Sequence, residues 1–406
     1  MYSTFGVMNA GLLFGNNVML THLLDKASYG AIGVATSYLV IATAIVTANG
    51  LGLVGVRRSQ LDDAGFARFD EAYVGTLQAG ALVLLIGLAL YSLLVESLGA
   101  LIVMMPTYLY ILSLNDYHSA ILVQRHDALR FGKAAFLSRA AGLAAMFGFI
   151  SLHLPSVVAY FAGLTVGELL STMYRRRSHE LFRVWFLSYT KPWFNEERRE
   201  LLRYGFAFLP LLLLGWASNG VDRLVIQKNL GLEAVAIYSF GMVVSQSVNV
   251  LNSAVTNTVM ARIYSKLATS QPVLEYFNKF ILAYSALSLL ALFVFERFAA
   301  LFIRLVAGEQ YAHSAPVAAI LVLSVALNGL YRICITVTDY YKRAAAKTGL
   351  SVASVATMLG CVLLTVKARG VGAVAWSVAI GNLVMALGAY ALARRYISMF
   401  HRPVER

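Results

Sequence analysis

The chain has 406 residues, of which 59% are apolar and only 13% charged, and its formal net charge is +13. Soluble globular domains average about 45–50% apolar and about 25% charged residues, so this sequence has too few polar side chains to cover a water-exposed surface. The composition excludes a soluble enzyme, a disordered chain and an ordinary nucleic-acid binder. It indicates an integral membrane protein, in which helical spans of about 20 apolar residues each leave little chain for a soluble catalytic domain.

The residue types that hold cofactors or metals form no recognisable motif. Cys334 and Cys361 lie in apolar segments without CxxC or Cys/His spacing, which predicts neither a disulfide nor a metal site. The sequence has no GxxxxGK[ST] phosphate loop, no HExxH and no paired carboxylates at a consistent spacing. We therefore expect no cofactor, no ATP-driven pump and no enzymatic activity.

Apolar stretches between charges and turn residues predict about twelve transmembrane helices and an all-α membrane fold. The expected spans cover residues 3–23, 29–53, 72–95, 99–122, 134–152, 155–173, 204–227, 234–260, 277–296, 313–338, 347–366 and 371–393. Most of the 33 basic residues fall in alternate connections. Because basic loops stay in the cytoplasm, this asymmetry predicts that both termini are cytoplasmic.

The longest connection, residues 174–203, is rich in basic residues and lies near the midpoint of the chain. It predicts a cytoplasmic linker, or alternatively a site for anionic lipid head groups. The linker would join an N-terminal six-helix lobe, residues 1–173, to a C-terminal six-helix lobe, residues 204–396, followed by a cytoplasmic tail, residues 397–406.

An internal comparison supports two related halves. A shift of 206 residues aligns Asn16-Asn17 with Asp222-Arg223, and it aligns residues 24–30 with residues 230–236. Each segment is a polar pair in a span, a short turn and then small residues that open the next span. Because both segments are expected to run outward, the pattern indicates a parallel repeat of the kind found in some transporters.

Polar residues of span eight share one helical face, within an arc of about 140° at 100° per residue. A polar group in hydrocarbon requires a polar neighbour or water. The stripe therefore predicts either hydrogen bonds between helices or the wall of a water-filled cavity, and we favour the cavity. It consists of Ser245, Gln246, Asn249, Asn252, Ser253, Thr256 and Asn257.

Three other spans carry polar faces, and together they would line a central cleft. Span one contributes asparagines, span two contributes threonines, and span ten contributes a mixed stripe. If the helix of span two continues past its apolar end, an arginine lies on the same side as the threonines. These residues are Asn9, Asn16 and Asn17 in span one, Thr36, Thr43, Thr47 and Arg58 in or after span two, and Ser324, Asn328, Tyr331, Arg332 and Thr336 in span ten.

Charged residues inside spans suggest further polar contacts. Arg139 and Glu168 lie at matching depths from the cytoplasmic side, which would permit an ion pair, although each could instead reach the nearby interface. Arg332 shares a face with Asn328 and would point either to the cavity or to the interface. Asp222 and Arg223 are adjacent, so they cannot face one another along a helix, and at least one should point into the bundle.

Three prolines lie inside predicted spans, at Pro106, Pro210 and Pro316. Proline removes a backbone hydrogen bond and can kink a helix. These positions predict either hinges of a moving transporter or prolines tolerated in a static bundle.

Residues 204–241, YGFAFLPLLLLGWASNGVDRLVIQKNLGLEAVAIYSFG, resemble the seventh and eighth helices of bacterial polysaccharide flippases of the O-antigen type. These proteins belong to the multidrug/oligosaccharidyl-lipid/polysaccharide exporter superfamily. The features that carry the resemblance are Tyr204-Gly205 with Pro210, the pair Asp222-Arg223, and Leu230-Gly231-x-Glu233-Ala234 running into Ile237-Tyr238-Ser239. A looser echo is HLLDKASYGAIGVATSYL at 22–39, followed by NGLGLVGVRRSQ at 49–60.

The resemblance implies two six-helix lobes around a central cavity that opens alternately to each side of a bacterial cytoplasmic (inner) membrane. The implied cargo is an oligosaccharide on an undecaprenyl-type lipid pyrophosphate, with membrane lipids, a coupling H⁺ or Na⁺ and a polysaccharide polymerase as possible partners, and no nucleic acid. The amides of the stripes would bind sugar hydroxyls, and cations would bind the pyrophosphate, because bare charge is costly in hydrocarbon. The cation candidates are Arg58, Arg139, Arg223 and Arg332, and the ion-coupling candidates are Asp222, Glu168 and Asp116.

Other functions remain open at this point. A cation-coupled drug exporter of the same superfamily would need a more apolar, aromatic cleft with few arginines. A peptidoglycan-precursor flippase would resemble a family that typically carries two additional helices. A membrane-embedded glycan polymerase or ligase would need a large outer loop, whereas the longest outer connection here covers about residues 297–312. A purely structural membrane scaffold would leave the polar faces unexplained.

Overall fold

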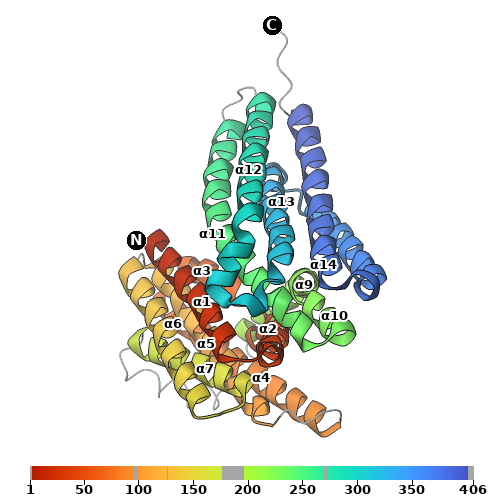
Figure 1. The fold of residues 1–406 in the computed structure, drawn as a ribbon. Helices are drawn as coiled ribbons and strands as arrows, with labels where there is room; N and C mark the ends of the chain where they lie inside the picture. Colours follow the sequence, from red (N-terminus) through yellow and green to blue (C-terminus); the bar gives the residue numbers. More distant parts are fainter. Residues whose placement is uncertain (1, 95–98, 126, 176–195, 269–272, 401–406) are drawn as a thin grey trace. The chain divides into compact units, whose positions relative to one another are not determined.

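The computed structural model describes residues 2–94, 99–125, 127–175, 196–268 and 273–400. Over these residues the chain forms helices and one 3₁₀ turn, and no strand (Figure 1). The helices are α1 (Tyr2–Leu23), α2 (Lys26–Thr47), α3 (Leu51–Gln60), α4 (Asp63–Leu94), α5 (Leu101–Gln124), α6 (Ala128–Ser151), α7 (Ser156–Arg175), α9 (Glu196–Asn219), α10 (Val221–Leu230), α11 (Leu232–Ala268), α12 (Val273–Ala307), α13 (Ser314–Tyr340) and α14 (Ala344–Phe400), with η2 (Glu309–Tyr311) before α13.

Each predicted span lies mostly on one or two of these helices, and the all-α membrane fold is confirmed. In the described part of the chain, 8 helices are long and apolar enough to cross a membrane, or 9 if the two arms of α9 count as one span. The last two predicted spans both lie on α14, which kinks at Gly370, where φ is 65°. Helices α1 and α5 are not among the 8 because their polar residues, such as Asn16 and Asp116, lower their mean hydropathy.

Helix α2 ends earlier than predicted. Ala48 and Asn49 have φ angles of 44° and 52°, and the Thr47 hydroxyl accepts a hydrogen bond from the Asn49 backbone N–H at 3.1 Å. The helix therefore does not continue past its apolar end, and Arg58 lies on the separate helix α3. The expectation that Arg58 shares a face with the threonines of span two is wrong, because this break changes the helical phase.

The predicted seventh span is also divided. Helix α9 bends by 41° between its arms Glu196–Pro210 and Leu212–Ser218, next to Pro210, where proline removes a backbone hydrogen bond. The chain then breaks again at Gly220 before α10 begins. Between α10 and α11 stands Gly231, whose φ of 87° is in the region that favours glycine.

The chain folds into two compact units. Unit 1 comprises Met1–Asn16 and Ala35–Trp216, and unit 2 comprises Asn17–Val34 and Ala217–Arg406. The end of α1 and the start of α2 thus pack with the C-terminal helices, and most of α9 packs with the N-terminal helices. Of the predicted linker and tail, residues 176–195 and 401–406 lie outside the described residues.

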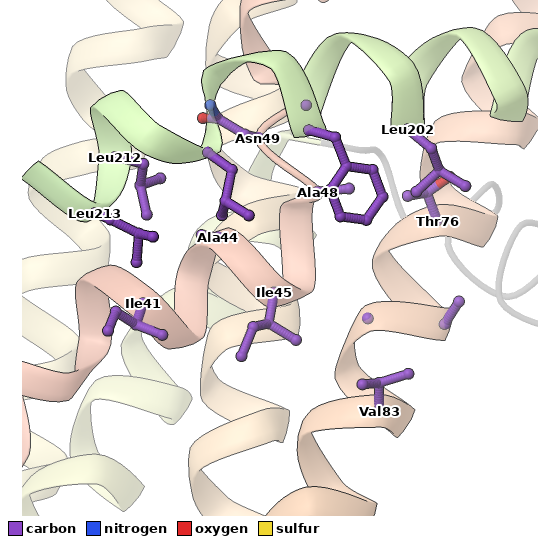
Figure 2. Close-up of a pocket in the computed structure, with 15 residues that line it drawn as sticks. Ile41, Ala44, Ile45, Ala48, Asn49, Thr76, Val83, Leu202, Leu212 and Leu213 are labelled. Carbon is purple, nitrogen blue, oxygen red and sulfur yellow. The ribbon is translucent and has the colours of Figure 1, made fainter.

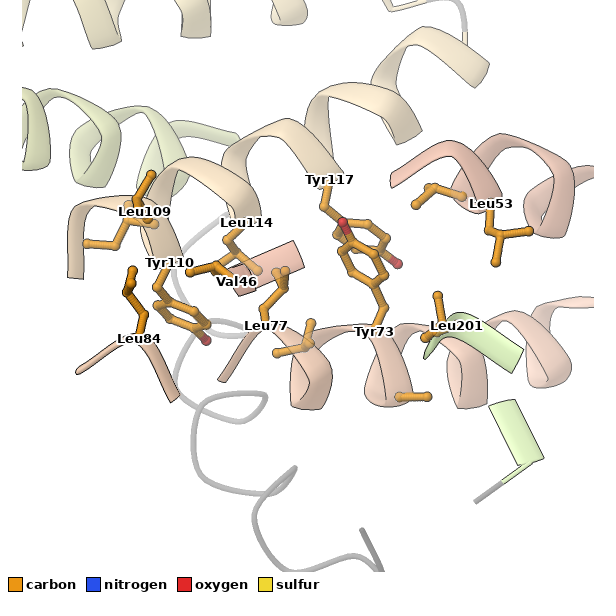
Figure 3. Packing of buried hydrophobic residues seen from close by; sticks show 14 of the residues in the cluster. Val46, Leu53, Tyr73, Leu77, Leu84, Leu109, Tyr110, Leu114, Tyr117 and Leu201 are labelled. Carbon is orange, nitrogen blue, oxygen red and sulfur yellow. The ribbon is translucent and has the colours of Figure 1, made fainter. Parts of the chain in front are cut away.

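The core of unit 1 is built around stacked tyrosines (Figure 3). Tyr73 on α4 and Tyr117 on α5 lie with their ring centroids 4.7 Å apart, and neither side chain is exposed. Leucines of α4 and α5, among them Leu77 and Leu114, surround the pair. Elsewhere in this unit α6 and α7 approach closely, because a Cβ on Gly167 would lie 2.1 Å from the Ser138 carbonyl oxygen.

In unit 2 the start of α2 packs against the start of α11. A Cβ on Gly30 would lie 2.0 Å from the Leu232 carbonyl oxygen and 3.3 Å from the Ala236 backbone nitrogen, and one on Gly33 would lie 2.5 Å from the Ser239 hydroxyl. Gly30 and Ala236 are equivalent under the 206-residue shift, as are Gly33 and Ser239. Contact between equivalent positions is what a two-fold axis produces where it passes through an interface, so this contact agrees with the internal repeat.

The Gly30 contact generates a test of stability. We expect Gly30→Ala to destabilise the protein by about 1–3 kcal/mol, because the added methyl group overpacks a backbone contact. The matched control is Gly360→Ala on α14, where nothing lies within 4 Å of the built Cβ. The measurement is thermal unfolding of the purified protein in detergent. Equal melting temperatures for the two variants would contradict the close packing of α2 on α11.

Candidate functional site

Arg332 on α13 faces the polar stripe of α11. Its Nη1 donates to the Ser253 hydroxyl at 3.1 Å, and its Nη2 donates to Asn257 Oδ1 at 3.1 Å. Ser253 and Asn257 are four residues apart and therefore share a face of α11. The side chain of Arg332 is half-buried and that of Asn257 exposed, so the guanidinium lies at the border between the helix pair and the surface of unit 2.

Asn252 has a different environment from the rest of the stripe. Its Nδ2 donates to the Val325 carbonyl at 3.1 Å, and its Oδ1 lies 2.6 Å from the hydroxyl of Tyr284 on α12. A Cβ on Gly329 would lie 1.9 Å from that hydroxyl, so glycine on α13 makes room for the contact. Asn252 therefore joins three helices. Of the two roles considered for the stripe, this residue forms hydrogen bonds between helices and does not line a cavity.

The other predicted amides of unit 2 are less enclosed. Asn249 is half-buried and donates to Gln246 Oε1 at 3.2 Å on the exposed side of α11. Asn328 is half-buried on α13, one helical turn before Arg332. The stripe of span eight is thus divided: Gln246, Asn249 and Asn257 lie toward the surface of unit 2, whereas Asn252 is used between helices.

The pair Asp222-Arg223 lies at the start of α10 in unit 2. The Asp222 side chain is buried and accepts a hydrogen bond from the hydroxyl of Tyr238 on α11, and it also accepts the Arg223 backbone N–H at 2.8 Å. Arg223 Nη1 donates to the Gly33 carbonyl at 3.2 Å, and its Nη2 lies 2.8 Å from the Met242 sulfur. Arg223 therefore connects α10 to α2 and α11.

A buried carboxylate organises a polar network in unit 1. Glu168 on α7 is 6% exposed. Its Oε2 accepts a hydrogen bond from the amide of Asn115 on α5, and its Oε1 accepts the hydroxyl of Ser138 on α6 at 2.8 Å. The side chain of Glu168 thus links three helices through neutral donors.

Arg175 extends this network toward the end of α7. It is buried, and its Nη1 donates to the Asn115 carbonyl at 3.1 Å and also to the Ser119 hydroxyl. Among the described residues no ion pair joins Arg139 to Glu168, so the paired alternative is not realised. Glu168 instead accepts hydrogen bonds from Asn115 and Ser138.

The remaining predicted site residues are distributed over both units. Asp116 follows Asn115 on α5 but is exposed, and Asn16 on α1 is buried. Asn17 Oδ1 accepts the hydroxyl of Tyr29 at 3.1 Å. Arg58 pairs with Asp63 at 3.0 Å and its guanidinium carbon lies 4.8 Å from the centre of the Phe66 ring, which orders the turn between α3 and α4.

Sequence reasoning missed the partners that hold these groups. Tyr284 and Tyr238 are single tyrosines in apolar spans, and their hydroxyls give no periodic signal. Arg175 was assigned to the basic linker, although it is buried. The run Asn115-Asp116 in the middle of an apolar helix was a further signal of the polar network around Glu168 in unit 1.

The fold resembles that of several solved transporters. A multidrug resistance MATE family transporter of the MOP superfamily, in an inward-facing conformation, matches with a TM-score of 0.70 and 15% identity, covering 96% of this chain and 95% of that chain. The lipid II flippase MurJ, in an inward closed conformation, matches with a TM-score of 0.76 and 11% identity, covering 97% of this chain and 87% of that chain. The eukaryotic MATE transporter AtDTX14 matches with a TM-score of 0.57 and 12% identity, covering 98% and 97%.

These similarities show that the chain has the fold shared by these transporters. The family described as "Polysaccharide biosynthesis protein" matches residues 19–316, and the chain belongs to this family. None of the curated proteins compared with the sequence matches it. The predicted resemblance to polysaccharide flippases is thus confirmed at the level of the family.

The network around Glu168 generates a second test. We expect Glu168→Leu to destabilise the protein by about 1–3 kcal/mol, because the Asn115 amide and the Ser138 hydroxyl would lose their acceptor in a buried site. The same replacement at Glu296, which is exposed on α12, serves as the control and should leave stability unchanged. Both values come from thermal unfolding in detergent. A Glu168→Leu protein as stable as the Glu296→Leu protein would show that the carboxylate is not the organising group.

Proposed function

We propose that this protein moves a lipid-linked oligosaccharide across a bacterial cytoplasmic membrane by alternating access. The cargo is a short glycan on an undecaprenyl-type pyrophosphate destined for surface polysaccharide, and both termini lie in the cytoplasm. Family membership and the fold support a transporter of this kind. One solved structure of this fold is called a lipid II flippase. A polysaccharide polymerase that consumes the flipped product is the proposed partner.

The observation that best supports this proposal is the environment of Arg332. A guanidinium at the border of the α11 and α13 pair is held by a hydroxyl and an amide rather than by a carboxylate. Its positive charge is therefore not neutralised by these two partners and can attract an anion. Asn249, Gln246 and Asn328 supply amides of the type that bind sugar hydroxyls. Together they suit a cargo that is both anionic and rich in hydroxyl groups.

For ion coupling we favour Asp116 among the three carboxylates predicted from the sequence. Asp222 and Glu168 are buried and already accept hydrogen bonds from neutral side chains. Asp116 is exposed, and exchange of H⁺ or Na⁺ requires access from water. In this proposal Glu168 and Asp222 organise the helices, and Asp116 carries the ion.

A second candidate is a cation-coupled drug exporter. It is favoured by the match to a multidrug resistance transporter at a TM-score of 0.70. A cationic drug would be repelled by the charge of Arg332, which its partners Ser253 and Asn257 leave uncompensated. An apolar drug would gain little from a stripe of amides. The surroundings of Arg332 therefore favour the anionic glycolipid over the drug.

The role of Arg332 can be tested by replacement. We expect Arg332→Gln to lower surface glycan export at least about tenfold, because a charge-assisted hydrogen bond contributes about 1.5–3 kcal/mol. Arg332→Lys should retain intermediate activity, because it keeps the charge but not the two-pronged geometry. The control is Arg262→Gln, an exposed arginine of the same helix pair. The measurement is complementation of cells in which the native gene is deleted.

The outcomes separate the two candidates. Export at the wild-type level in Arg332→Gln would remove the proposed anion site. Loss of drug resistance instead of glycan export on deletion of the gene would support the exporter.

Water access to α11 provides another test. In a Cys361→Ser background, we expect Asn249→Cys to react with a membrane-impermeant maleimide, because Asn249 lies on the exposed side of the stripe. Thr256→Cys on the same helix should react only after denaturation, since Thr256 is fully buried. Labelling is measured by mass shift in membrane vesicles. If Asn249→Cys were as unreactive as Thr256→Cys in native vesicles, the stripe would face lipid or protein rather than water.

A further inference from the structure

Helices α11 and α13 pack together in unit 2 and run in the same direction. Near their ends the Tyr340 hydroxyl donates to the Leu267 carbonyl at 3.4 Å, a partner 73 residues away in the sequence. Closer to the middle of both helices Arg332 donates to Asn257, a partner 75 residues away. Because the two separations are nearly equal, positions on one helix stay level with positions on the other. Side chains of α11 and α13 therefore form shared rows.

The exposed face of α11 differs from that of the neighbouring helix α12. Exposed residues of α11 include amides and hydroxyls, which hydrocarbon does not stabilise. Those in the middle of α12 are large and apolar, as expected of a helix that faces lipid. The α11 residues are Gln246, Ser247, Asn257 and Thr258, and the α12 residues are Leu282, Leu287, Leu289, Leu290 and Phe293. The face of α11 that carries the stripe is therefore suited to water and polar ligands.

An aromatic pair continues this face beyond Arg332. Asn257, Ala261 and Tyr264 are spaced by four and three residues, so they share one face of α11, and all three are exposed. On α13, Tyr340 lies about two turns after Arg332. The ring centroids of Tyr264 and Tyr340 are 6.4 Å apart, their planes are inclined by 37°, and each residue is 38% exposed. A half-exposed aromatic surface thus follows the cation and the amide.

A third tyrosine at the same end of unit 2 has different surroundings. Tyr276 on α12 is 44% exposed, but the Nζ atom of Lys266 lies 4.6 Å from the centre of its ring. Within the described residues, the ring contact of Tyr264 is with Tyr340 alone. The pair therefore keeps an aromatic surface for a ligand, whereas the ring of Tyr276 already has a cation against it.

An apolar cavity in unit 1 offers no comparable groups for a glycan. It has a volume of about 370 Å³ and lies between α2, α4 and α9 (Figure 2). The described residues that line it are apolar except for Asn49 and Thr76. Sugar hydroxyls need donors and acceptors, so the exposed face of α11 and α13 is better suited to a glycan than this cavity.

The chemistry of a sugar matches the order of groups along α11 and α13. One face of a pyranose ring carries C–H groups with a small positive charge, and the negative face of an aromatic ring attracts them. The hydroxyls of the same sugar can bind Asn257 and Ser253. A guanidinium, an amide and an aromatic pair thus follow one another, as a phosphate and the sugars attached to it do in a glycolipid.

We propose that Tyr264 and Tyr340 form a platform on which a sugar ring of the cargo stacks while Arg332 binds its phosphate. This inference rests on the proposed function and adds the residues that distinguish a glycan-bearing carrier from a bare one. About 10 Å along the helix separates Asn257 from Tyr264, which is longer than one pyranose ring. The platform therefore contacts a sugar beyond the one attached to the phosphate.

The experiment compares two ligands of the purified full-length protein. One is undecaprenyl pyrophosphate without sugar, and the other is the lipid-linked oligosaccharide extracted from cells that lack the gene, in which unflipped cargo accumulates. Tyr264→Leu should lower the affinity for the glycan-bearing lipid about fivefold, because an aromatic contact is lost. Its affinity for the bare carrier should stay within about twofold of the wild type. Native mass spectrometry in detergent measures both affinities.

Three other variants define what the tyrosine ring does. Tyr264→Phe keeps the ring and should bind both lipids like the wild type. Tyr340→Leu removes the second ring from another helix and should repeat the selective loss, which keeps the test valid if Tyr264→Leu folds poorly. Arg332→Gln should weaken the binding of both lipids at least about tenfold. Binding of the bare carrier by the tyrosine variants also shows that they are folded.

The matched control is Tyr276→Leu, which removes an exposed tyrosine from the same end of unit 2. It should leave the affinity for both lipids within about twofold of the wild type. If Tyr264 only anchored the protein at the membrane surface, Tyr264→Leu and Tyr276→Leu would behave alike. That result would overturn the proposal.

Two further results would also overturn it. One is an unchanged affinity for the glycan-bearing lipid in both Tyr264→Leu and Tyr340→Leu. The other is an equal loss of affinity for both lipids in these variants, which would mean that the tyrosines do not contact the glycan. Failure of the proposed function is distinguishable, because the wild-type protein would then bind neither lipid.

Discussion

Helix α2 is held by backbone contacts so close that only glycine is tolerated at them. Its start meets α11 at Gly30 in unit 2, and its end meets α4 at Gly80 and α9 at Gly205 in unit 1. Helices gain little from apolar burial in lipid, so close approach and van der Waals contact replace the hydrophobic effect. Because α2 contributes residues to both units, the helix packing within each unit depends on these contacts.

The same solvent determines how the polar groups are arranged. Water is absent from the hydrocarbon core, so each buried polar side chain needs a partner within the protein. Glu168, Asp222 and Asn252 each receive a hydrogen bond from a neighbouring helix. These three residues therefore connect helices, whereas Arg332 and Asn249 lie nearer the surface of unit 2.

The sequence was sufficient to predict the helices and the general class of protein, because long apolar runs and basic loops are direct consequences of the bilayer. The bend beside Pro210 agrees with the backbone hydrogen bond that proline removes, although the sequence did not show which of the three prolines would bend its helix. The break after Thr47, with positive φ angles at Ala48 and Asn49, was missed, because the apolar run resumes at Leu51 and outweighed the turn signal of Asn49-Gly50. Matching depth suggested a pair of Arg139 and Glu168, but depth does not determine which direction a side chain faces around its helix.

The two units differ in the chemistry that they offer. The cavity of unit 1 is apolar, whereas α11 and α13 of unit 2 present an arginine and several amides. A lipid-linked glycan combines an isoprenoid chain with charged phosphates and hydroxyl-rich sugars, and no single environment can stabilise all three. An apolar cavity excludes charge, and an amide-rich face gains nothing from a hydrocarbon chain. The presence of both environments in one chain suits the cargo of the proposed function better than either does alone, whereas a small apolar drug would require only the first of them.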